Sequence, residues 1–161
     1  TKRVTELGEI GYLLLNYQYE NGVFPDLSAG TFISGLTTSK WPSWMAEFGN
    51  EIGINPPLDP INEFDPSIMC PVPPYDPTGT CWRDDLHQFT CPLDSHIYAY
   101  IFEAPTLFSY LVANLEYLGV GAWNNLAADP CSLFPGATCN CFNYWVQSTD
   151  SFGITNWQEP T

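Results

Sequence analysis

Residues 1–25 constrain the fold most, because they combine a helical repeat with a sharp stop. Apolar side chains recur at intervals of three, three, four and three residues, which places them on one side of a helix. This stripe consists of Val4, Leu7, Ile10, Leu14 and Tyr17. Asn21 and Gly22 then favour a left-handed helix end, and Pro25 cannot continue a helix. The helix is therefore expected to end near Glu20.

A second informative stretch, residues 97–116, has the composition of a β-hairpin. Aromatic and β-branched residues fill 97–102 and recur over 107–116, and the segment Glu103-Ala104-Pro105-Thr106 between them favours a turn. The leucine, alanine, asparagine and glutamate content of 108–118 also permits a helix. We favour two strands, which would give the first helix an antiparallel sheet to pack on.

The helix and its stop resemble the soluble part of the type IV pilins and type II secretion pseudopilins. In that family a charged pair, matched here by Lys2 and Arg3, opens the soluble half of a long helix. The helix closes with a Y-x-x-x-x-G-x-[YF]-P segment. A shortened version of that segment is formed by Tyr19, Gly22, Phe24 and Pro25.

Two further segments are similar to the same family. Residues 57–62, Pro-Leu-Asp-Pro-Ile-Asn, are close to the family's Leu-Pro-x-Asp-Pro motif, which an Asn or Trp follows before the first strand. Tyr98 and Tyr100 match its Tyr-x-Tyr strand. The family's next strand, Tyr-x-Leu-x-Ala-x-Leu-Glu, is matched imperfectly by Tyr110, Val112, Asn114, Leu115 and Glu116.

The resemblance implies an α+β, pilin-like fold in which the N-terminal amphipathic helix packs on a small antiparallel sheet with disulfide-stapled loops. We expect one headpiece domain over residues 1–161, with a family-like core at 1–117, an insertion at 63–93 and a C-terminal extension at 118–161. The implied function is that of a structural subunit, a pilin or pseudopilin, of an exported bacterial filament. Its partners would be copies of itself and other pilins, and its location extracellular or periplasmic, on a cell-surface filament.

The family's apolar N-terminal half-helix is not part of this sequence, so the chain is interpreted as the soluble headpiece alone. In the family that half-helix anchors the subunit in the membrane and then packs in the filament core. Contact with a membrane is therefore expected only through that helix. The first turn of the remaining helix is expected to be bare, and its later turns to be covered by the sheet.

Six cysteines, an even number without a C-x-x-C pair, indicate a disulfide framework in an oxidising compartment. Six cysteines allow about fifteen connectivities, which the sequence leaves open. We expect Cys131 to pair with Cys139 or Cys141, the remaining one of those two to reach Cys91, and Cys70 to pair with Cys81. The cysteines are Cys70, Cys81, Cys91, Cys131, Cys139 and Cys141.

Two metal sites are considered in the same region. Calcium takes carboxylate and carbonyl oxygens from flexible loops, although no D-x-[DN]-x-[DN]-G loop occurs here. The calcium candidates are Asp65, Asp76, Asp84, Asp85 and Asp94. The alternating series Cys81, His87, Cys91 and His96 matches no familiar structural zinc spacing, and disulfides explain its cysteines better. No cofactor is expected apart from the calcium alternative.

The charge balance disfavours one class of partner. With 18 acidic and 4 basic residues the net charge is -14, so a basic patch for nucleic acid is not expected. No nucleophile, metalloprotease or phosphate-binding motif occurs in the sequence, and we expect no enzyme. The alternative function is a secreted, disulfide-stapled module that binds glycans or calcium, with Trp41, Trp44 and the aspartates as its site. Paired tryptophans around a proline more often pack onto a core.

Three minor elements complete the expectations. Residues 26–39 are interpreted as a loop over the helix. A short helix is expected to begin with Ser43 as its cap and to stop at Gly49. Residues 142–147 have the composition of a further strand.

Overall fold

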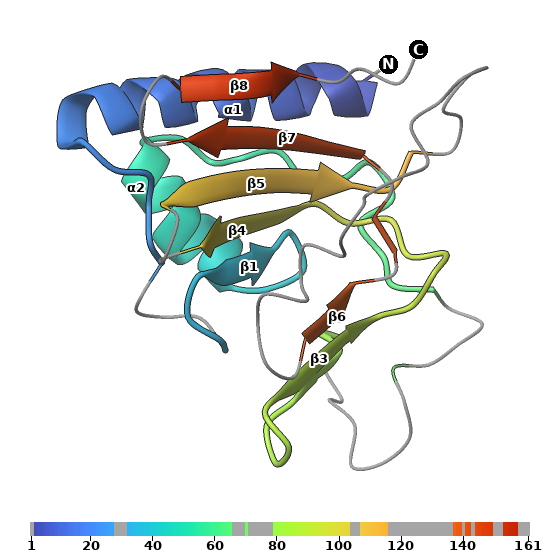
Figure 1. The fold of residues 1–161 in the computed structure, drawn as a ribbon. Coiled ribbons are helices and arrows are strands. Elements are labelled where there is room, and N and C mark those ends of the chain that lie inside the picture. Colours follow the sequence, from blue (N-terminus) through green and yellow to red (C-terminus); the bar gives the residue numbers. More distant parts are fainter. Residues whose placement is uncertain are drawn as a thin grey trace.

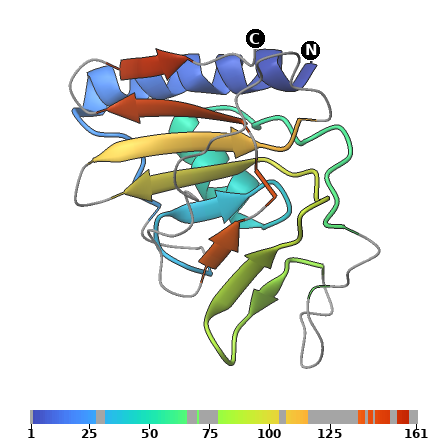
Figure 2. The same cartoon turned by 45° about the vertical axis from the view of Figure 1, so that its right-hand side comes forward.

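The computed structural model describes residues 2–27, 32–65, 70, 79–103, 107–115, 137–139, 141–142, 144–149 and 153–157. Within these ranges the chain has an α+β fold: a long N-terminal helix, a five-stranded antiparallel sheet and a smaller three-stranded sheet (Figure 1). The helix lies along the β7–β8 side of the large sheet, and the small sheet lies beyond its opposite edge (Figure 2). None of the described helices is long and apolar enough to cross a membrane.

The first helix, α1 (Lys2–Asn21), forms where the apolar stripe predicts it. It ends one residue after the expected position, where Gly22 adopts φ 79° and donates its N–H to the Gln18 carbonyl at 2.7 Å. A residue without Cβ takes this left-handed conformation at no steric cost. Phe24 then turns into the core, where the Tyr100 hydroxyl donates to the Pro25 carbonyl at 2.6 Å.

The large sheet has the strand order β1-β4-β5-β7-β8, with every neighbouring pair antiparallel. The predicted hairpin is present as two adjacent strands in which Ile101 lies opposite Tyr110, so the helical alternative for that segment is wrong. The expected strand at 142–147 begins two residues later than predicted. The strands are β1 (Leu36–Thr38), β4 (Ala99–Glu103), β5 (Phe108–Ala113), β7 (Tyr144–Thr149) and β8 (Gly153–Trp157).

The inner strand β4 is buried on both of its faces, and its successive side chains point alternately into two cores. In β4, Tyr100 and Phe102 face α1, while Ala99 and Ile101 face the small sheet. The helix-side core comprises Leu7, Ile10, Leu14, Phe24, Leu27, Trp44, Phe48, Ile52, Tyr98, Tyr100, Phe102, Leu111, Ala113 and Leu115. The small-sheet core comprises Leu36, Trp41, Cys81, Trp82, Phe89, Cys91, Ile97, Ala99, Ile101, Val112, Cys141 and Phe142.

The insertion at 63–93, expected as a disulfide-stapled loop, contains regular structure. β2 (Trp82–Arg83) and β3 (Gln88–Cys91) form an antiparallel pair inside that segment. β3 also pairs in parallel with β6 (Ala137–Cys139), from the C-terminal extension. Strands of two to four residues show too little alternation to be recognised from sequence.

The loop predicted for residues 26–39 is also wrong in part. Its last residues form β1, which pairs with β4 and whose three side chains are all buried. The strand carries two threonines. A hydrogen bond of 2.6 Å joins the hydroxyl oxygens of Thr37 and Ser43. A partner 60 or so residues away in the sequence, rather than the local pattern, makes this segment a strand.

The predicted short helix is present but differs at both ends. It begins as a π-helical turn, η1 (Trp44–Gly49), and Ser43 makes no side-chain cap because its hydroxyl bonds Thr37 instead. It continues through Gly49 as α2 (Asn50–Ile52) and ends at Gly53, with φ 81°. A Cβ on Gly49 would lie 2.7 Å from Pro56 Cδ, so glycine is required there for close packing rather than as a stop.

Candidate functional site

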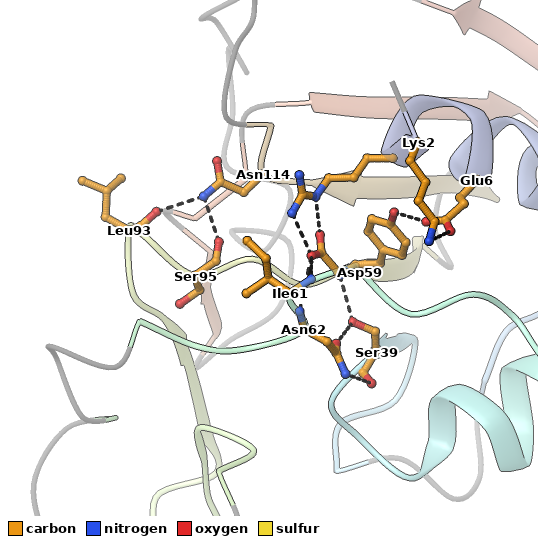
Figure 3. Close-up of polar contacts among 11 residues, drawn as sticks. Lys2, Glu6, Ser39, Asp59, Ile61, Asn62, Leu93, Ser95 and Asn114 are labelled. Atoms are coloured by element: carbon orange, nitrogen blue, oxygen red, sulfur yellow. Dashed lines mark hydrogen bonds and ion pairs between the residues drawn. The ribbon is translucent and has the colours of Figure 1, made fainter.

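The most extensive polar arrangement among the described residues lies at the start of α1 (Figure 3). Arg3 donates to Asp59 twice, from Nε to Oδ2 at 2.8 Å and from Nη2 to Oδ1 at 3.0 Å. The Asp59 side chain is 0% exposed and that of Arg3 is 12% exposed. A two-bonded arginine–carboxylate pair fixes both distance and orientation. We call this pair the buried fork.

The backbone around Asp59 supports the same carboxylate. The N–H groups of Ile61 and Asn62 donate to Asp59 Oδ1 at 2.8 and 3.3 Å. An aspartate that accepts bonds from backbone groups two and three residues later defines a turn, and the prolines on either side of it restrict the chain further. The buried charge therefore has its full complement of donors, which limits the cost of burying it.

Asn62 extends the arrangement to the large sheet. It adopts φ 51°, a left-handed conformation that asparagine tolerates. Its side chain accepts from Ser39 Oγ at 2.6 Å and donates to the Ser39 carbonyl at 3.3 Å. Ser39 in turn makes two hydrogen bonds with Tyr98. Ser39 Oγ accepts from the Tyr98 N–H at 2.9 Å, and the Ser39 N–H donates to the Tyr98 carbonyl at 2.8 Å. The turn is thus tied to the residues that follow β1 and precede β4.

Tyr98 links back to α1. Its hydroxyl donates to Glu6 Oε2 in a short hydrogen bond, and Lys2 Nζ lies 3.7 Å from Glu6 Oε1. Burial, followed by the hydrogen bond to Glu6, raises the pKa of Tyr98 well above its ordinary value. The hydroxyl therefore stays protonated and remains a donor across the physiological range.

A second amide side chain, that of Asn114, bonds the segment that precedes β4. Asn114, just after β5, donates from Nδ2 to the carbonyls of Ser95 at 2.8 Å and Leu93 at 3.4 Å. Ser95 Oγ accepts from the Asp65 N–H at 2.9 Å. Figure 3 shows this group beside the buried fork, so the start of α1, the 59–62 turn and the segment before β4 meet at one place.

Chemically, this arrangement fixes a helix and does not present a reactive group. Both oxygens of Asp59 are used by donors, and Glu6 is held by Tyr98 and Lys2. What it supplies is a rigid direction for α1 relative to the sheet. We call the buried fork together with Glu6, Tyr98 and Asn62 the helix anchor.

The predicted stripe on α1 is placed largely as expected. Leu7, Ile10 and Leu14 are buried in the helix-side core, and Val4 is half-buried against it. The expectation of a bare first turn is wrong, because both Arg3 and Val4 are packed. Tyr17 lies at the margin of the stripe, where its hydroxyl donates to Glu51 at 2.8 Å.

The calcium candidates are not brought together among the described residues, where no group of three or more His, Cys, Asp or Glu could hold a metal ion. Asp85 accepts two bonds from Arg83, at 2.8 and 3.0 Å, and the first cause of its lowered pKa is this bonding. Asp65 is buried, and Asp84 lies 3.4 Å from the Trp82 indole nitrogen. Asp94 is exposed, and Asp76 lies outside the described residues.

The cysteines of the Cys/His series are used in disulfides. Cys70 pairs with Cys81, and Cys91 pairs with Cys141, both as expected. The expected Cys131–Cys139 pairing falls outside the described residues, since Cys131 is not among them. Since Cys81 and Cys91 are both in disulfides, neither is a thiolate ligand for zinc beside the two histidines.

The two tryptophans proposed as an alternative glycan platform are both in the interior. Trp41 is 2% exposed and Trp44 is 0% exposed. Their indole N–H groups donate to the carbonyls of Thr80 at 2.7 Å and Pro57 at 3.2 Å. Trp41 packs in the small-sheet core and Trp44 in the helix-side core, which agrees with the expectation for paired aromatics around a proline.

An open hollow of about 550 Å³ lies over the η1–α2 turn. Its lining carries no titratable or nucleophilic side chain. The residues are Met45, Ala46, Gly49, Asn50, Gly53, Ile54 and Asn55.

Both halves of the buried fork lie in segments that are distinctive in the sequence, but nothing in the sequence joins them. Arg3 belongs to a charged pair and Asp59 to a proline-rich motif. A pair separated by 56 residues leaves no local signal. The bracketing prolines and the asparagine three residues after Asp59 are the features from which a carboxylate-centred turn could have been inferred.

No family model, curated protein or solved structure matches the chain.

Proposed function

We propose that this chain is the headpiece of a structural subunit, a pilin or pseudopilin, of an exported bacterial filament. The proposal assigns it no catalytic activity and no cofactor. Its partners are copies of itself and other subunits of the same class. It places the chain on a cell-surface filament.

The observation that carries the proposal is the buried fork. Lys2-Arg3 and residues 57–62 each resemble a family motif, and they lie far apart in the sequence. Arg3 and Asp59 nevertheless bond each other directly at the start of α1. A subunit that is held in a filament by its helix needs its headpiece fixed to that helix, and the fork provides this.

The disulfides and the surface charge agree with an exported protein. Two disulfides among the described residues are typical of proteins outside the cytoplasm. A net charge of -14 favours a well-solvated surface.

The proposal makes a direct demand on the natural protein. In the resembled family the helix continues upstream as an apolar segment, so we expect about 20 apolar residues leading directly into α1, the length that spans a bilayer. A Gly-Phe-x-x-x-Glu processing site should open that segment. A plain cleavable secretion signal ending at this point would contradict the proposal.

The functional test uses the full-length subunit in its own cells. Arg3→Met should abolish or thin the surface filaments seen by electron microscopy, while subunit amounts are followed by immunoblot. Arg83→Met is the matched control, because it removes the same type of side chain from the exposed Arg83–Asp85 pair. Double substitution of Arg3→Met with Asp59→Asn tests whether folding alone is limiting, since it removes both buried charges.

Normal filaments in cells carrying Arg3→Met would overturn the role given to the buried fork. Normal filaments in cells lacking the gene would overturn the filament function itself. Loss of filaments in Arg83→Met and Arg3→Met alike would also count against the proposal, since it would show no special role for the helix anchor.

A further inference from the structure

The outward side of α1 carries a continuous stripe of exposed side chains. They recur at intervals of four, three, four and three residues, opposite the buried Leu7, Ile10 and Leu14. Tyr12 is 64% exposed and Tyr19 is 90% exposed. The stripe consists of Thr5, Glu9, Tyr12, Asn16 and Tyr19. We call it the tyrosine stripe.

Two features make this stripe unusual for a solvated surface. Tyrosine is among the side chains that most often dominate protein interfaces, because it offers large contact area at little cost in conformational entropy. In a chain with a net charge of -14, the stripe itself contains a single carboxylate, Glu9. Both features favour contact with another protein surface.

The positions of the stripe are symmetric about Tyr12 to within one residue. Thr5 and Tyr19 lie seven residues before and after Tyr12, while Glu9 and Asn16 lie three before and four after it. Two copies of α1 packed antiparallel across a two-fold axis at Tyr12 would therefore match Thr5 with Tyr19. The same arrangement would place the Glu9 carboxylate against the Asn16 amide. A two-fold interface requires this kind of self-complementary surface.

The charges at the two ends of α1 select the same arrangement. Glu20 follows Lys2 by 18 residues, which is five full turns at 3.6 residues per turn, so both point to one side of the helix. At 1.5 Å per residue they lie about 15 and 12 Å from Tyr12 along the axis, in opposite directions. In an antiparallel pair, Lys2 therefore meets Glu20 of the second copy, and the reverse pair forms at the other end. A parallel pair would instead place like charges together.

We propose that the tyrosine stripe is a homotypic docking surface, on which a second copy of this chain packs with its α1 antiparallel. Tyr12 meets its own counterpart at the two-fold axis, and two symmetric Lys2–Glu20 pairs fix the direction. Lys2 is available for this contact, since its side chain is 73% exposed and its partner Glu6 lies at 3.7 Å. The inference concerns the chain in solution and does not depend on the proposed function.

The contact is expected to be weak and to depend on salt. One face of a 20-residue helix is about 30 Å long and offers less than the roughly 800 Å² per partner of a standard interface. Repulsion between two copies of charge -14 opposes association and is screened at moderate ionic strength. Antiparallel helices also join oppositely directed subunits, so in a filament of uniform polarity the contact would connect two filaments rather than neighbours within one.

The test is sedimentation velocity on the isolated chain, from about 10 µM to about 1 mM, a range that brackets weak association. The parent chain should show a concentration-dependent dimer that strengthens when salt is raised from low to physiological levels. Tyr12→Arg should raise the dissociation constant at least about tenfold, because it places like charges at the two-fold axis. This weakening is expected even though the added arginine makes the net charge of each copy less negative, which by itself would reduce the repulsion between copies. Leu93→Arg is the matched control, since Leu93 is 65% exposed and lies away from α1.

The direction of packing is tested by exchanging the charges. Lys2→Glu should weaken the dimer by up to about 25-fold, since each exposed pair contributes a factor of at most about five and the two factors multiply. Adding Glu20→Lys should restore the affinity. Circular dichroism of each variant establishes that α1 is still folded.

A strictly monomeric parent chain across this range would overturn the proposal. So would equal effects of Tyr12→Arg and Leu93→Arg. A Lys2→Glu, Glu20→Lys double variant no stronger than Lys2→Glu alone would overturn the antiparallel arrangement. These outcomes are independent of the filament test, which is made in cells with the full-length subunit.

Discussion

The two faces of the large sheet are fastened in different ways. On the α1 face the contacts are non-covalent: a packed helix-side core, closed at one end by the buried fork. On the other face two disulfides and a cluster of aromatic rings hold short strands in place. Long elements with a regular pattern can bury enough apolar area to hold themselves, whereas strands of two to four residues need cross-links.

The two arginine–aspartate forks repeat this contrast with the same chemistry. The Arg3–Asp59 pair has side chains 12% and 0% exposed, and the Arg83–Asp85 pair has side chains 23% and 45% exposed. Both have two bonds of nearly equal length. Burial, rather than bond geometry, is therefore what should separate their contributions to stability.

The largest effect is expected from Arg3→Met. Removing the guanidinium leaves the Asp59 charge buried without its partner, which costs about 3 to 5 kcal/mol of unfolding free energy. Urea titration followed by circular dichroism measures the change. Combining it with Asp59→Asn should recover part of the loss, because the amide oxygen still accepts from Ile61 while the charge is gone. Arg83→Met should leave the midpoint unchanged, and an equal loss there would break the contrast between the forks.

The next effect tests the helix-side core. Leu14 belongs to the apolar stripe of α1 and is 1% exposed, so Leu14→Ala should cost about 2 to 5 kcal/mol through lost burial and the cavity left behind. Leu93→Ala, at an exposed leucine, should change the stability by less than about 0.5 kcal/mol. A thermal melt of Leu14→Ala that coincides with that of the parent would show that α1 is not central to the fold.

The cross-links of the other face are expected to differ from each other. In the chain-entropy description, stabilisation grows with loop length, and the two disulfides close separations of 50 and 11 residues. Cys91→Ala with Cys141→Ala should cost about 4 kcal/mol, and Cys70→Ala with Cys81→Ala about 3 kcal/mol. Hydrogen exchange should show the loss concentrated in β2 and β3, with α1 protected. Equal loss of protection in α1 would mean that the two faces are not fastened independently.

The smallest effect is alkaline destabilisation, to which both faces contribute. Burial, followed by the bond to Glu51, raises the pKa of Tyr17 to about 12, and burial, followed by the charge of Glu103, raises that of Tyr110 to about 12. A tyrosine in the unfolded chain titrates near pH 10. This stability is fully present below about pH 10 and is lost as the pH rises through about 12, because only the unfolded chain releases its protons in that window.

Urea midpoints should therefore stay constant below about pH 10 and fall as the pH rises from about 10 to about 12. Tyr17→Phe removes the contribution from the α1 face and Tyr110→Phe that from the other face. In each variant the urea midpoint should fall less steeply with pH than it does in the parent chain. A slope unchanged in both variants would assign the alkaline loss to other groups.

How far the sequence predicts this fold depends on the distance over which each signal acts. The end of α1 was predictable to within one residue, because Asn21, Gly22 and Pro25 act through their own backbone preferences. The β4–β5 hairpin was predictable for the same reason, since both strands and their turn are contiguous. Both are local features with long, regular patterns.

Features that depend on distant partners were missed. β1 is a strand because β4 lies beside it, and β3 acquires a second neighbour from the C-terminal extension. Gly49 is a residue type that often ends a helix, yet the helix continues through it, and glycine is needed there because Pro56 packs where a Cβ would be. The pairing of Arg3 with Asp59 belongs to the same class, since the two residues lie 56 positions apart and no local pattern connects them.

The position of the buried fork has a mechanical consequence. Arg3 lies in the first turn of α1, so a force applied to the start of the helix acts on the fork before it acts on the rest of the helix. The fork must therefore break before the following turns of the helix can separate from the sheet. Single-molecule pulling on the N-terminus should accordingly show one abrupt rupture, which Arg3→Met converts into gradual extension at lower force. A gradual extension of the parent chain would show that the fork bears no load.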